Sequence, residues 1–159
     1  MAQIRFFELA GKTDNIRFSP FCWRIRMALL HKGLEFEGLP WGFTDKDKLL
    51  ETGYDRVPVL EHDGKWIADS EVIAHYLDDI FPERPLFPHG AASRAMAKFL
   101  SVWCDQEIHA RLSPHIVRDV FLATHEKDRA YYRESREQRF GKKLEELAVK
   151  AEDVRALLT

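Results

Sequence analysis

Three short groups of residues in this sequence have the types and positions needed to bind an anionic ligand. Ser19 opens a predicted helix, Val57-Pro58 leads into a predicted strand, and Asp69-Ser70 opens a second predicted helix. Ligands of open α/β sheets bind at such strand–helix junctions, and helix N-termini attract anions through their unpaired N–H groups. Taken singly, each group is more typical of a helix cap or a strand boundary. Together, in this order, they predict one binding site at one edge of a sheet.

A cysteine close to the first group adds a second chemical possibility. Ser19-Pro20-Phe21-Cys22 is a thioredoxin-type C-x-x-C motif in which serine replaces the first cysteine. The first cysteine carries the attacking thiolate in redox proteins, so its replacement argues against disulfide exchange. Cys22 lies one turn inside the helix, where a structural role is favoured. With Cys104 in a different predicted helix, we expect two reduced thiols in a cytoplasmic protein.

The elements that must position these groups alternate between strands and helices. Strands are predicted at residues 4–9, 34–39, 57–60 and 65–68, and helices at 19–32, 44–51 and 69–81. This β-α-β-α-β-β-α order predicts an α/β layer. Asp63-Gly64 predicts a hairpin turn between the last two strands, which makes the four-stranded sheet mixed.

After this α/β region the sequence changes character. Residues 82–90 contain three prolines and a glycine, a composition typical of a linker. Helices are predicted at 91–112, from 114 to about 126, and in a last segment up to 159. That last segment carries an apolar stripe, which must be buried against another surface: Leu144, Leu147, Ala151, Val154 and Leu158. We therefore expect a helical domain that is shortened or partly ordered here, or a stripe covered by a second chain.

The overall composition excludes several classes of function. The 159 residues are 45% hydrophobic and 31% charged, as in globular proteins with a core, and the net charge is −2. This balance predicts no binding to nucleic acid or to an anionic membrane surface. Arg5 and Glu8 interrupt the apolar N-terminal stretch, so it does not resemble a secretory signal. The seven histidines show no metal-ligand spacing, and we expect no metal.

Three blocks of sequence resemble the signature of the glutathione S-transferase superfamily. They are S-P-F-C-W-R-I-R-M-A-L at 19–29, R-V-P-V-L at 56–60, and D-S followed by V-I-A-H-Y-L within 69–77. The first block is similar to the serine-type zeta class. The stretch from G-F-T at 42–44 to R-V-P-V at 56–59 resembles bacterial glutathione-dependent β-etherases. The resemblance implies a thioredoxin-like glutathione-binding domain at 1–81, a linker at 82–90 and an all-α domain at 91–159.

The resemblance also implies a role for each residue of the predicted site. Ser19 would be catalytic and would donate a hydrogen bond to the thiolate of glutathione. Val57, before a cis Pro58, would pair through its backbone with the cysteinyl unit. Asp69 and Ser70 would hold the γ-glutamyl end. The partner of the glycyl carboxylate stays open among three cations: Lys46, Lys48 and Arg56.

The activity implied by the resemblance is that of a glutathione S-transferase. Activated glutathione would attack a hydrophobic or aromatic electrophile, for example in β-aryl ether cleavage. The alternatives are a glutathione-dependent isomerase of the zeta (maleylacetoacetate isomerase) kind and a non-catalytic glutathione-binding scaffold. Five aromatic side chains are candidates either for the electrophile pocket or for the core: Phe18, Phe21, Trp41, Phe43 and Trp103. The resemblance further implies a homodimer.

Overall fold

The computed structural model describes residues 4–13, 15–88 and 90–147 of the chain. It divides into two compact units, residues 1–88 and 89–159, and each is described by itself. The division falls within the predicted linker. None of the helices in the described ranges is long and apolar enough to cross a bilayer.

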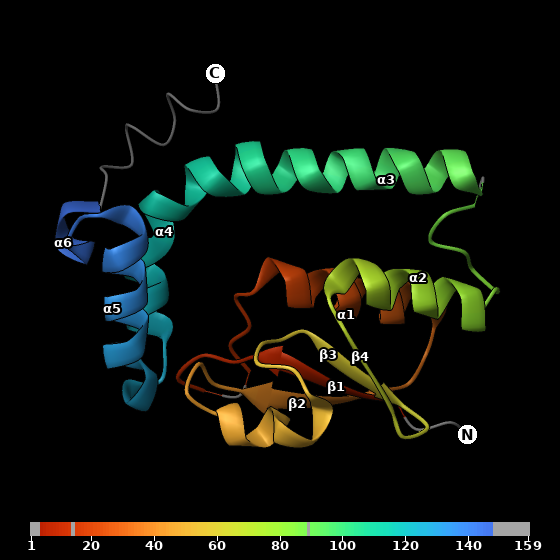
Figure 1. Ribbon diagram of the computed structural model, residues 1–159, viewed down its shortest axis with the longest axis horizontal. Helices are drawn as coiled ribbons and strands as arrows, with labels where there is room; N and C mark the ends of the chain where they lie inside the picture. The colour runs from red at the N-terminus through yellow and green to blue at the C-terminus, as the bar shows by residue number, and fades with distance from the viewer. Residues whose placement is uncertain (1–3, 14, 89, 148–159) are drawn as a thin grey trace. The chain divides into compact units, whose positions relative to one another are not determined.

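The first unit is a four-stranded mixed sheet with helices (Figure 1). Its strands are β1 (Ile4–Leu9), β2 (Glu37–Trp41), β3 (Val59–His62) and β4 (Lys65–Ala68), in the order β2-β1-β3-β4. β1 and β2 are parallel, whereas β3 is antiparallel to both β1 and β4. The predicted mixed sheet is therefore confirmed. Pro40 belongs to β2, which is an edge strand.

Two α-helices lie side by side over one face of this sheet, and a 3₁₀ helix lies at the other face (Figure 1). They are α1 (Pro20–Lys32), α2 (Ser70–Ile80) and the 3₁₀ helix η1 (Lys46–Thr52). The core between helices and sheet consists of fully buried apolar side chains, among them Phe6, Ile25, Leu29, Leu60, Ile73 and Leu77.

Local sequence signals explain where α1 begins and ends. Ser19 caps its N-terminus, proline occupies its first position, and Gly33 closes it in the left-handed conformation with φ 68°. The N–H of Leu34 still donates to the Leu29 carbonyl at 3.0 Å. Leu34 is therefore still bound to the helix end, and the second strand begins at Glu37 rather than at the predicted residue 34.

The described residues of the second unit form helices joined by short turns. It contains α3 (Ala91–Trp103), the π-helical segment η2 (Cys104–His109), α4 (Ala110–Ala123), the 3₁₀ turn η3 (Glu126–Asp128), α5 (Arg129–Phe140) and α6 (Leu144–Leu147). The fold class, a thioredoxin-like sheet domain followed by an all-α domain, is thus confirmed.

The predicted break between residues 112 and 114 is wrong, because α4 runs through Pro114. Proline lacks an N–H and its ring crowds the carbonyl four residues earlier, so an α-helix must adjust around it. Here the π-helical turn η2 lies just before α4, and the Ser113 hydroxyl donates to the His109 carbonyl at 2.6 Å. The His109 carbonyl, at the junction of η2 and α4, therefore has a hydrogen-bond donor in the turn that precedes Pro114.

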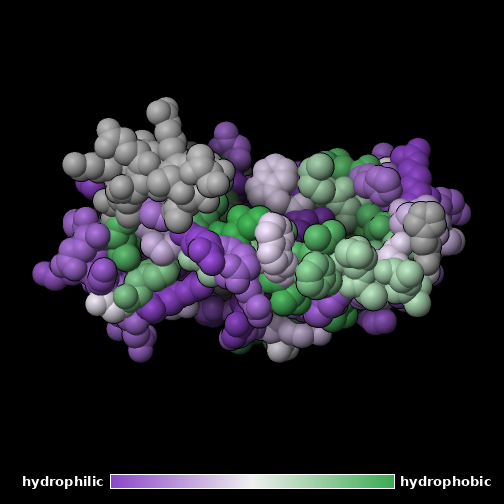
Figure 2. All heavy atoms as spheres, turned by 90° about the horizontal axis from the view of Figure 1, so that it is seen from above, coloured by the Kyte–Doolittle hydropathy of each residue, from purple (hydrophilic) through white to green (hydrophobic). Residues whose placement is uncertain are grey.

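The predicted apolar stripe is described only at its start. Leu144 and Leu147 are buried, whereas Ala151, Val154 and Leu158 lie outside the described residues. Unlike α6, α3 buries no residue, and the face of the molecule in Figure 2 shows many hydrophobic atoms. The large apolar side chains that α3 exposes are Met96, Phe99, Leu100, Val102 and Trp103.

Candidate functional site

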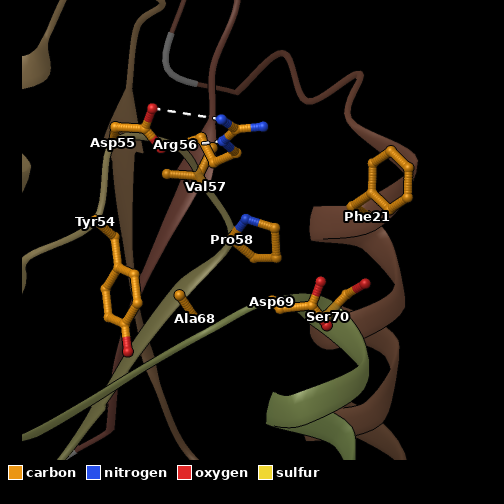
Figure 3. Close-up of a pocket in the computed structure, with 9 residues that line it drawn as sticks. All are labelled: Phe21, Tyr54, Asp55, Arg56, Val57, Pro58, Ala68, Asp69 and Ser70. Carbon is orange, nitrogen blue, oxygen red and sulfur yellow. Dashed lines mark hydrogen bonds and ion pairs between the residues drawn. The ribbon is translucent and has the colours of Figure 1, made fainter.

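A cleft of about 420 Å³ opens in the first unit (Figure 3). Nine residues from three stretches of the chain line it: Phe21, Tyr54, Asp55, Arg56, Val57, Pro58, Ala68, Asp69 and Ser70. The structure therefore brings together four of the five predicted site residues. The fifth, Ser19, is not part of the lining.

Val57 and Pro58 form one wall of the cleft. The peptide bond between them is cis, as the resemblance implied. The sheet ladder begins only at Val59, and in the described part of the chain no hydrogen bond is found to the backbone of Val57. An extended peptide could therefore pair with Val57 as an added strand does.

The opposite wall is the N-terminus of α2. Asp69 Oδ1 accepts the N–H groups of Glu71 and Val72 at 2.8 and 3.2 Å, so one carboxylate oxygen caps the helix. Its backbone lies at φ 72°, a left-handed conformation that side-chain-bearing residues rarely adopt and that is found at binding sites. Ser70 is buried, with 7% exposure, at the first helical position. This corner combines a carboxylate, a hydroxyl and the positive end of a helix.

Ser19 lies at the N-terminus of α1, two residues before Phe21 of the cleft. Its hydroxyl oxygen accepts the N–H of Cys22 at 3.3 Å, and the side chain is largely buried. This bond is the helix cap that the Ser-Pro pattern predicted. The same hydroxyl also forms a hydrogen bond with the Cys22 side chain.

Cys22 is fully enclosed, in agreement with a structural role. It is 1% exposed, and its sulfur accepts the Leu9 N–H at 3.5 Å. Burial raises the pKa of the Cys22 thiol, although hydrogen bonds from Ser19 and Leu9 act in the opposite direction. The thiol therefore stays protonated at neutral pH.

Of the three cations considered for a carboxylate ligand, Arg56 alone is part of the cleft lining. Its guanidinium pairs with the neighbouring Asp55 at 3.0 Å, and hydrogen bonding to Arg56 lowers the pKa of that carboxyl. Lys46 donates to the Asp55 carbonyl and lies 4.9 Å from the centre of the Trp41 ring. Lys48 pairs with Asp45 at 2.9 Å.

The aromatic residues divide between the site and the core. Phe21 lines the cleft, whereas Phe18 and Phe43 stack on each other with ring centres 6.0 Å apart. Trp41 is buried and donates from Nε1 to the Asp45 carbonyl at 2.7 Å. Sequence reasoning missed Tyr54 as a lining residue, and the signal available was its position four residues before the cis proline.

No group of three or more metal-ligating side chains occurs within the described ranges. The cleft instead offers hydrogen-bonding groups, the two carboxylates of Asp55 and Asp69, and the guanidinium of Arg56. These suit a small ligand that is itself extended, polar at both ends and peptide-like.

A thioredoxin-like sheet domain with this cleft, followed by a helical domain, is the architecture of a glutathione S-transferase. Residues 18–80 match the family "Glutathione S-transferase, N-terminal domain", and residues 95–158 match "Glutathione S-transferase, C-terminal domain". The two matches together span most of the chain. The chain belongs to the glutathione S-transferase superfamily.

Similar proteins come from plants and fungi. Glutathione S-transferase U7 of Arabidopsis thaliana is 38% identical over 94 residues, which cover 57% of this chain and 41% of the relative. Glutathione S-transferase U4 of the same plant is 36% identical over 108 residues, covering 63% and 48%. This chain thus matches less than half the length of these relatives.

Solved structures extend the similarity to both units. A glutathione S-transferase of Ceriporiopsis subvermispora, crystallised with glutathione, has a TM-score of 0.82 and 26% identity, covering 97% of this chain and 66% of that one. Glutathione transferase GSTFuA3 from Phanerochaete chrysosporium has a TM-score of 0.85 and 26% identity, covering 98% and 68%.

Proposed function

We propose that this chain binds glutathione in the cleft and activates its thiol, as a serine-type glutathione transferase. The observation that carries the proposal is the convergence of the Val57 backbone, the Asp69-Ser70 corner and Arg56 around one cleft. Glutathione is an extended tripeptide with a zwitterionic γ-glutamyl end, a peptide-like middle and a carboxylate at the glycyl end. Each of these parts has a matching group in the cleft.

The γ-glutamyl end binds at the start of α2. Its carboxylate accepts the Ser70 hydroxyl and a helix N-terminal N–H, and its ammonium faces the Asp69 carboxylate. The cysteinyl backbone pairs with Val57. The glycyl carboxylate is left for Arg56, which shares its guanidinium between Asp55 and the ligand.

Ser19 is the residue proposed to act on the sulfur. A free thiol has a pKa of about 8.5, so most glutathione is protonated at neutral pH. Lowering that pKa by about two units requires roughly 2.7 kcal/mol of preferential stabilisation of the thiolate. A charge-assisted hydrogen bond from the Ser19 hydroxyl, together with the N-terminus of α1, is of this size.

The thiolate then attacks a hydrophobic electrophile, and we propose an aryl-ether carbon. A carbon–sulfur bond forms, the carbon–oxygen bond breaks, and the phenolate leaves with the bonding electron pair. Phenolate is a good leaving group, so this reaction needs little acid assistance. The resemblance of residues 42–44 and 56–59 to β-etherases favours this reaction over zeta-type isomerisation.

Binding is tested by titration calorimetry with reduced glutathione. The unaltered chain should bind one glutathione per chain, and Ser70→Ala should weaken binding roughly 5- to 150-fold, equivalent to about 1–3 kcal/mol for a charged hydrogen bond left unmade. Ser101→Ala, a serine change in α3, is the matched control and should bind normally. Equal affinity in the unaltered chain and Ser70→Ala would remove the cleft as the glutathione site.

Chemistry is tested on two substrates in parallel. With glutathione and a β-aryl ether, we expect released phenol and a thioether product. Turnover of a maleyl diene without phenol release would instead identify an isomerase, and tight binding with neither product would identify a scaffold.

A homodimer is the last part of the proposal. Five large apolar side chains are exposed on α3, which is a large apolar surface for one helix to expose. Sedimentation equilibrium should give twice the mass of the chain, and a single-chain mass across micromolar concentrations would exclude the dimer.

A further inference from the structure

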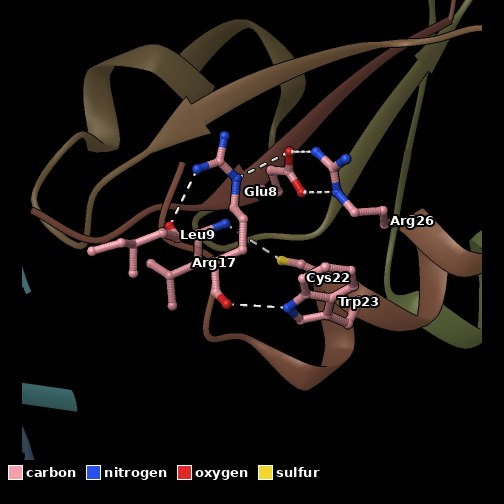
Figure 4. A network of polar contacts seen from close by, with 7 residues as sticks. Glu8, Leu9, Arg17, Cys22, Trp23 and Arg26 are labelled. Atoms are coloured by element: carbon pink, nitrogen blue, oxygen red, sulfur yellow. Dashed lines mark hydrogen bonds and ion pairs between the residues drawn. The ribbon is translucent and has the colours of Figure 1, made fainter. Parts of the chain in front are cut away.

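A buried carboxylate of β1 lies between two arginines, one from the loop before α1 and one from α1 itself (Figure 4). Glu8 of β1 is 1% exposed. Its Oε1 lies 3.0 Å from Arg17 Nε, and its Oε2 accepts Arg26 Nε at 3.0 Å. Arg26 also donates to Oε1 through its terminal nitrogen. We call these three residues the Glu8 cluster.

The neighbouring strand β2 has a glycine, Gly38, where it faces the Glu8 cluster. A Cβ atom at Gly38 of β2 would lie 2.7 Å from Glu8 Oε1 and 3.1 Å from a terminal nitrogen of Arg26. Any side chain there would push the carboxylate away from its partners. The backbone of β2 therefore leaves the charged groups in contact.

Arg17 connects the cluster to the loop before Ser19. Its backbone bridges Ala10 at the end of β1, and its guanidinium donates to the Ile16 carbonyl at 3.2 Å. Its own carbonyl accepts Trp23 Nε1 from the first turns of α1 at 3.1 Å (Figure 4). Arg17 is thus fixed to strand, loop and helix, two residues before Ser19.

The cluster also carries an excess of positive charge, since one carboxylate faces two guanidiniums. Its field reaches the sulfur of Cys22, which lies three residues after Ser19. Beyond the dominant effect of burial, the negative charge of Glu8 raises the pKa of that thiol and the positive charge of Arg17 lowers it. A second sulfur bound beside Ser19 would experience the same two charges.

We propose that Arg17, held by Glu8, is a positioning residue that fixes the Ser19 hydroxyl and sets the electrostatic potential at the N-terminus of α1. This inference rests on the proposed function, in which the glutathione thiolate binds at that helix end. Arg17 does not touch the substrate. It acts through the loop and through its charge, so its loss should leave glutathione affinity nearly unchanged while reducing the thiolate fraction.

The other ionisable groups near the site are the same in the unaltered protein and in the Arg17 and Glu8 variants. α1 contributes Cys22 itself and Arg24, whose guanidinium lies 5.0 Å from the centre of the Phe21 ring, and the cleft side contributes Tyr54, Asp55, Arg56 and Asp69. A difference between variants of the Glu8 cluster therefore reports on that cluster alone.

The first measurement uses bound glutathione, whose thiolate absorbs in the ultraviolet. In Arg17→Gln the pKa of the bound thiol should rise by about half a unit to one unit, which lowers the ratio of thiolate to thiol roughly threefold to tenfold. Glu8→Gln removes the opposing charge and should lower this pKa. Arg17→Lys keeps the charge and should restore a value near that of the unaltered protein.

Arg5→Gln is the matched control. Arg5 lies in β1, the same strand as Glu8, but it pairs with Glu61 of β3 and not with the Glu8 cluster. This change should leave the thiol pKa unchanged. If the Glu8 cluster were only structural, the pKa of the bound thiol would shift in the same direction in Arg17→Gln and Glu8→Gln, or would not shift in either. Equal thiol pKa values in all variants that bind glutathione normally would overturn the inference.

A second measurement needs no glutathione and separates this inference from the proposed function. In a Cys104→Ser background, the ¹³Cβ shift of labelled Cys22 is followed against pH. Arg17→Gln should raise and Glu8→Gln should lower the titration midpoint. Opposite shifts support the charge-setting role even if glutathione binds elsewhere, and an unmoved midpoint in both variants overturns it.

Discussion

A buried ion pair joins the ends of α1 and α2 to the segment that leaves the first unit. Lys32 Nζ donates to Asp78 Oδ1 at 2.7 Å and to the Phe81 carbonyl at 2.8 Å, and its side chain has no exposed surface. Asp78 also accepts the N–H groups of Leu86 and Phe87 at 2.7 and 3.2 Å. We predict that Asp78→Asn destabilises the first unit strongly, because it leaves the ammonium buried without its counter-ion.

The magnitude follows from removing one partner of a buried pair, which costs about 3–5 kcal/mol. Burial alone would raise the pKa of Asp78, but the bonds from Lys32, Leu86 and Phe87 outweigh it and lower the pKa. A carboxyl with a lowered folded pKa stabilises the fold above its unfolded pKa of about 3.9, and this contribution is lost as the pH falls through the folded value. Asp78→Asn should therefore show a weaker loss of stability in acid.

The assay is urea unfolding of Asp78→Asn, Lys32→Met and the double variant. A Trp103→Phe background restricts tryptophan fluorescence to the first unit, which contains Trp23, Trp41 and Trp66.

We expect the double variant to be less destabilised than the sum of the two single changes by at least about 1 kcal/mol, because it leaves no buried charge unpaired. Strict additivity of Asp78→Asn and Lys32→Met, with unchanged m-values, would refute this account of the pair.

Three further changes test other contacts. Gly38→Ala should destabilise by about 1–3 kcal/mol through overpacking against Glu8, as measured by urea midpoint, and a neutral effect would mean that the carboxylate can move. Asp69→Gly should be less destabilising in thermal unfolding than Asp69→Ala, because both lose the helix cap but only glycine accepts φ 72° without strain; the reverse order would contradict this. Hydrogen bonds from Arg133 lower the pKa of Glu145 to about 2, so the protection of the α6 amides, relative to the intrinsic exchange rate at each pH, should fall as the pH falls from about 4.5 towards 2, and Glu145→Gln should abolish that dependence.

The parts of the fold that the sequence could predict are those determined locally. Ser19 and Gly33 mark the two ends of α1, and the Asp63-Gly64 turn marks the hairpin. Val57 and Asp69 could be grouped into one site because strand and helix ends meet at one sheet edge.

Contacts between distant charged side chains could not be predicted in the same way. Glu8 follows a strand pattern in which charged residues are normally exposed, and its partners are 9 and 18 positions away. The Lys32–Asp78 pair spans 46 positions. The path of α4 through Pro114 depended on an adjustment of the preceding turn, for which sequence periodicity has no signal.

The edge position of Pro40 has a consequence for how this protein avoids self-association during synthesis. Trp41 directs its carbonyl towards β1, where it accepts the Ala10 N–H, so the adjacent Pro40 presents its ring nitrogen to the outside of the sheet. An incoming strand finds no donor there, and the opposite edge is only four residues long and begins with an exposed Lys65. Nascent chains crowded on a ribosome should therefore resist edge-to-edge aggregation.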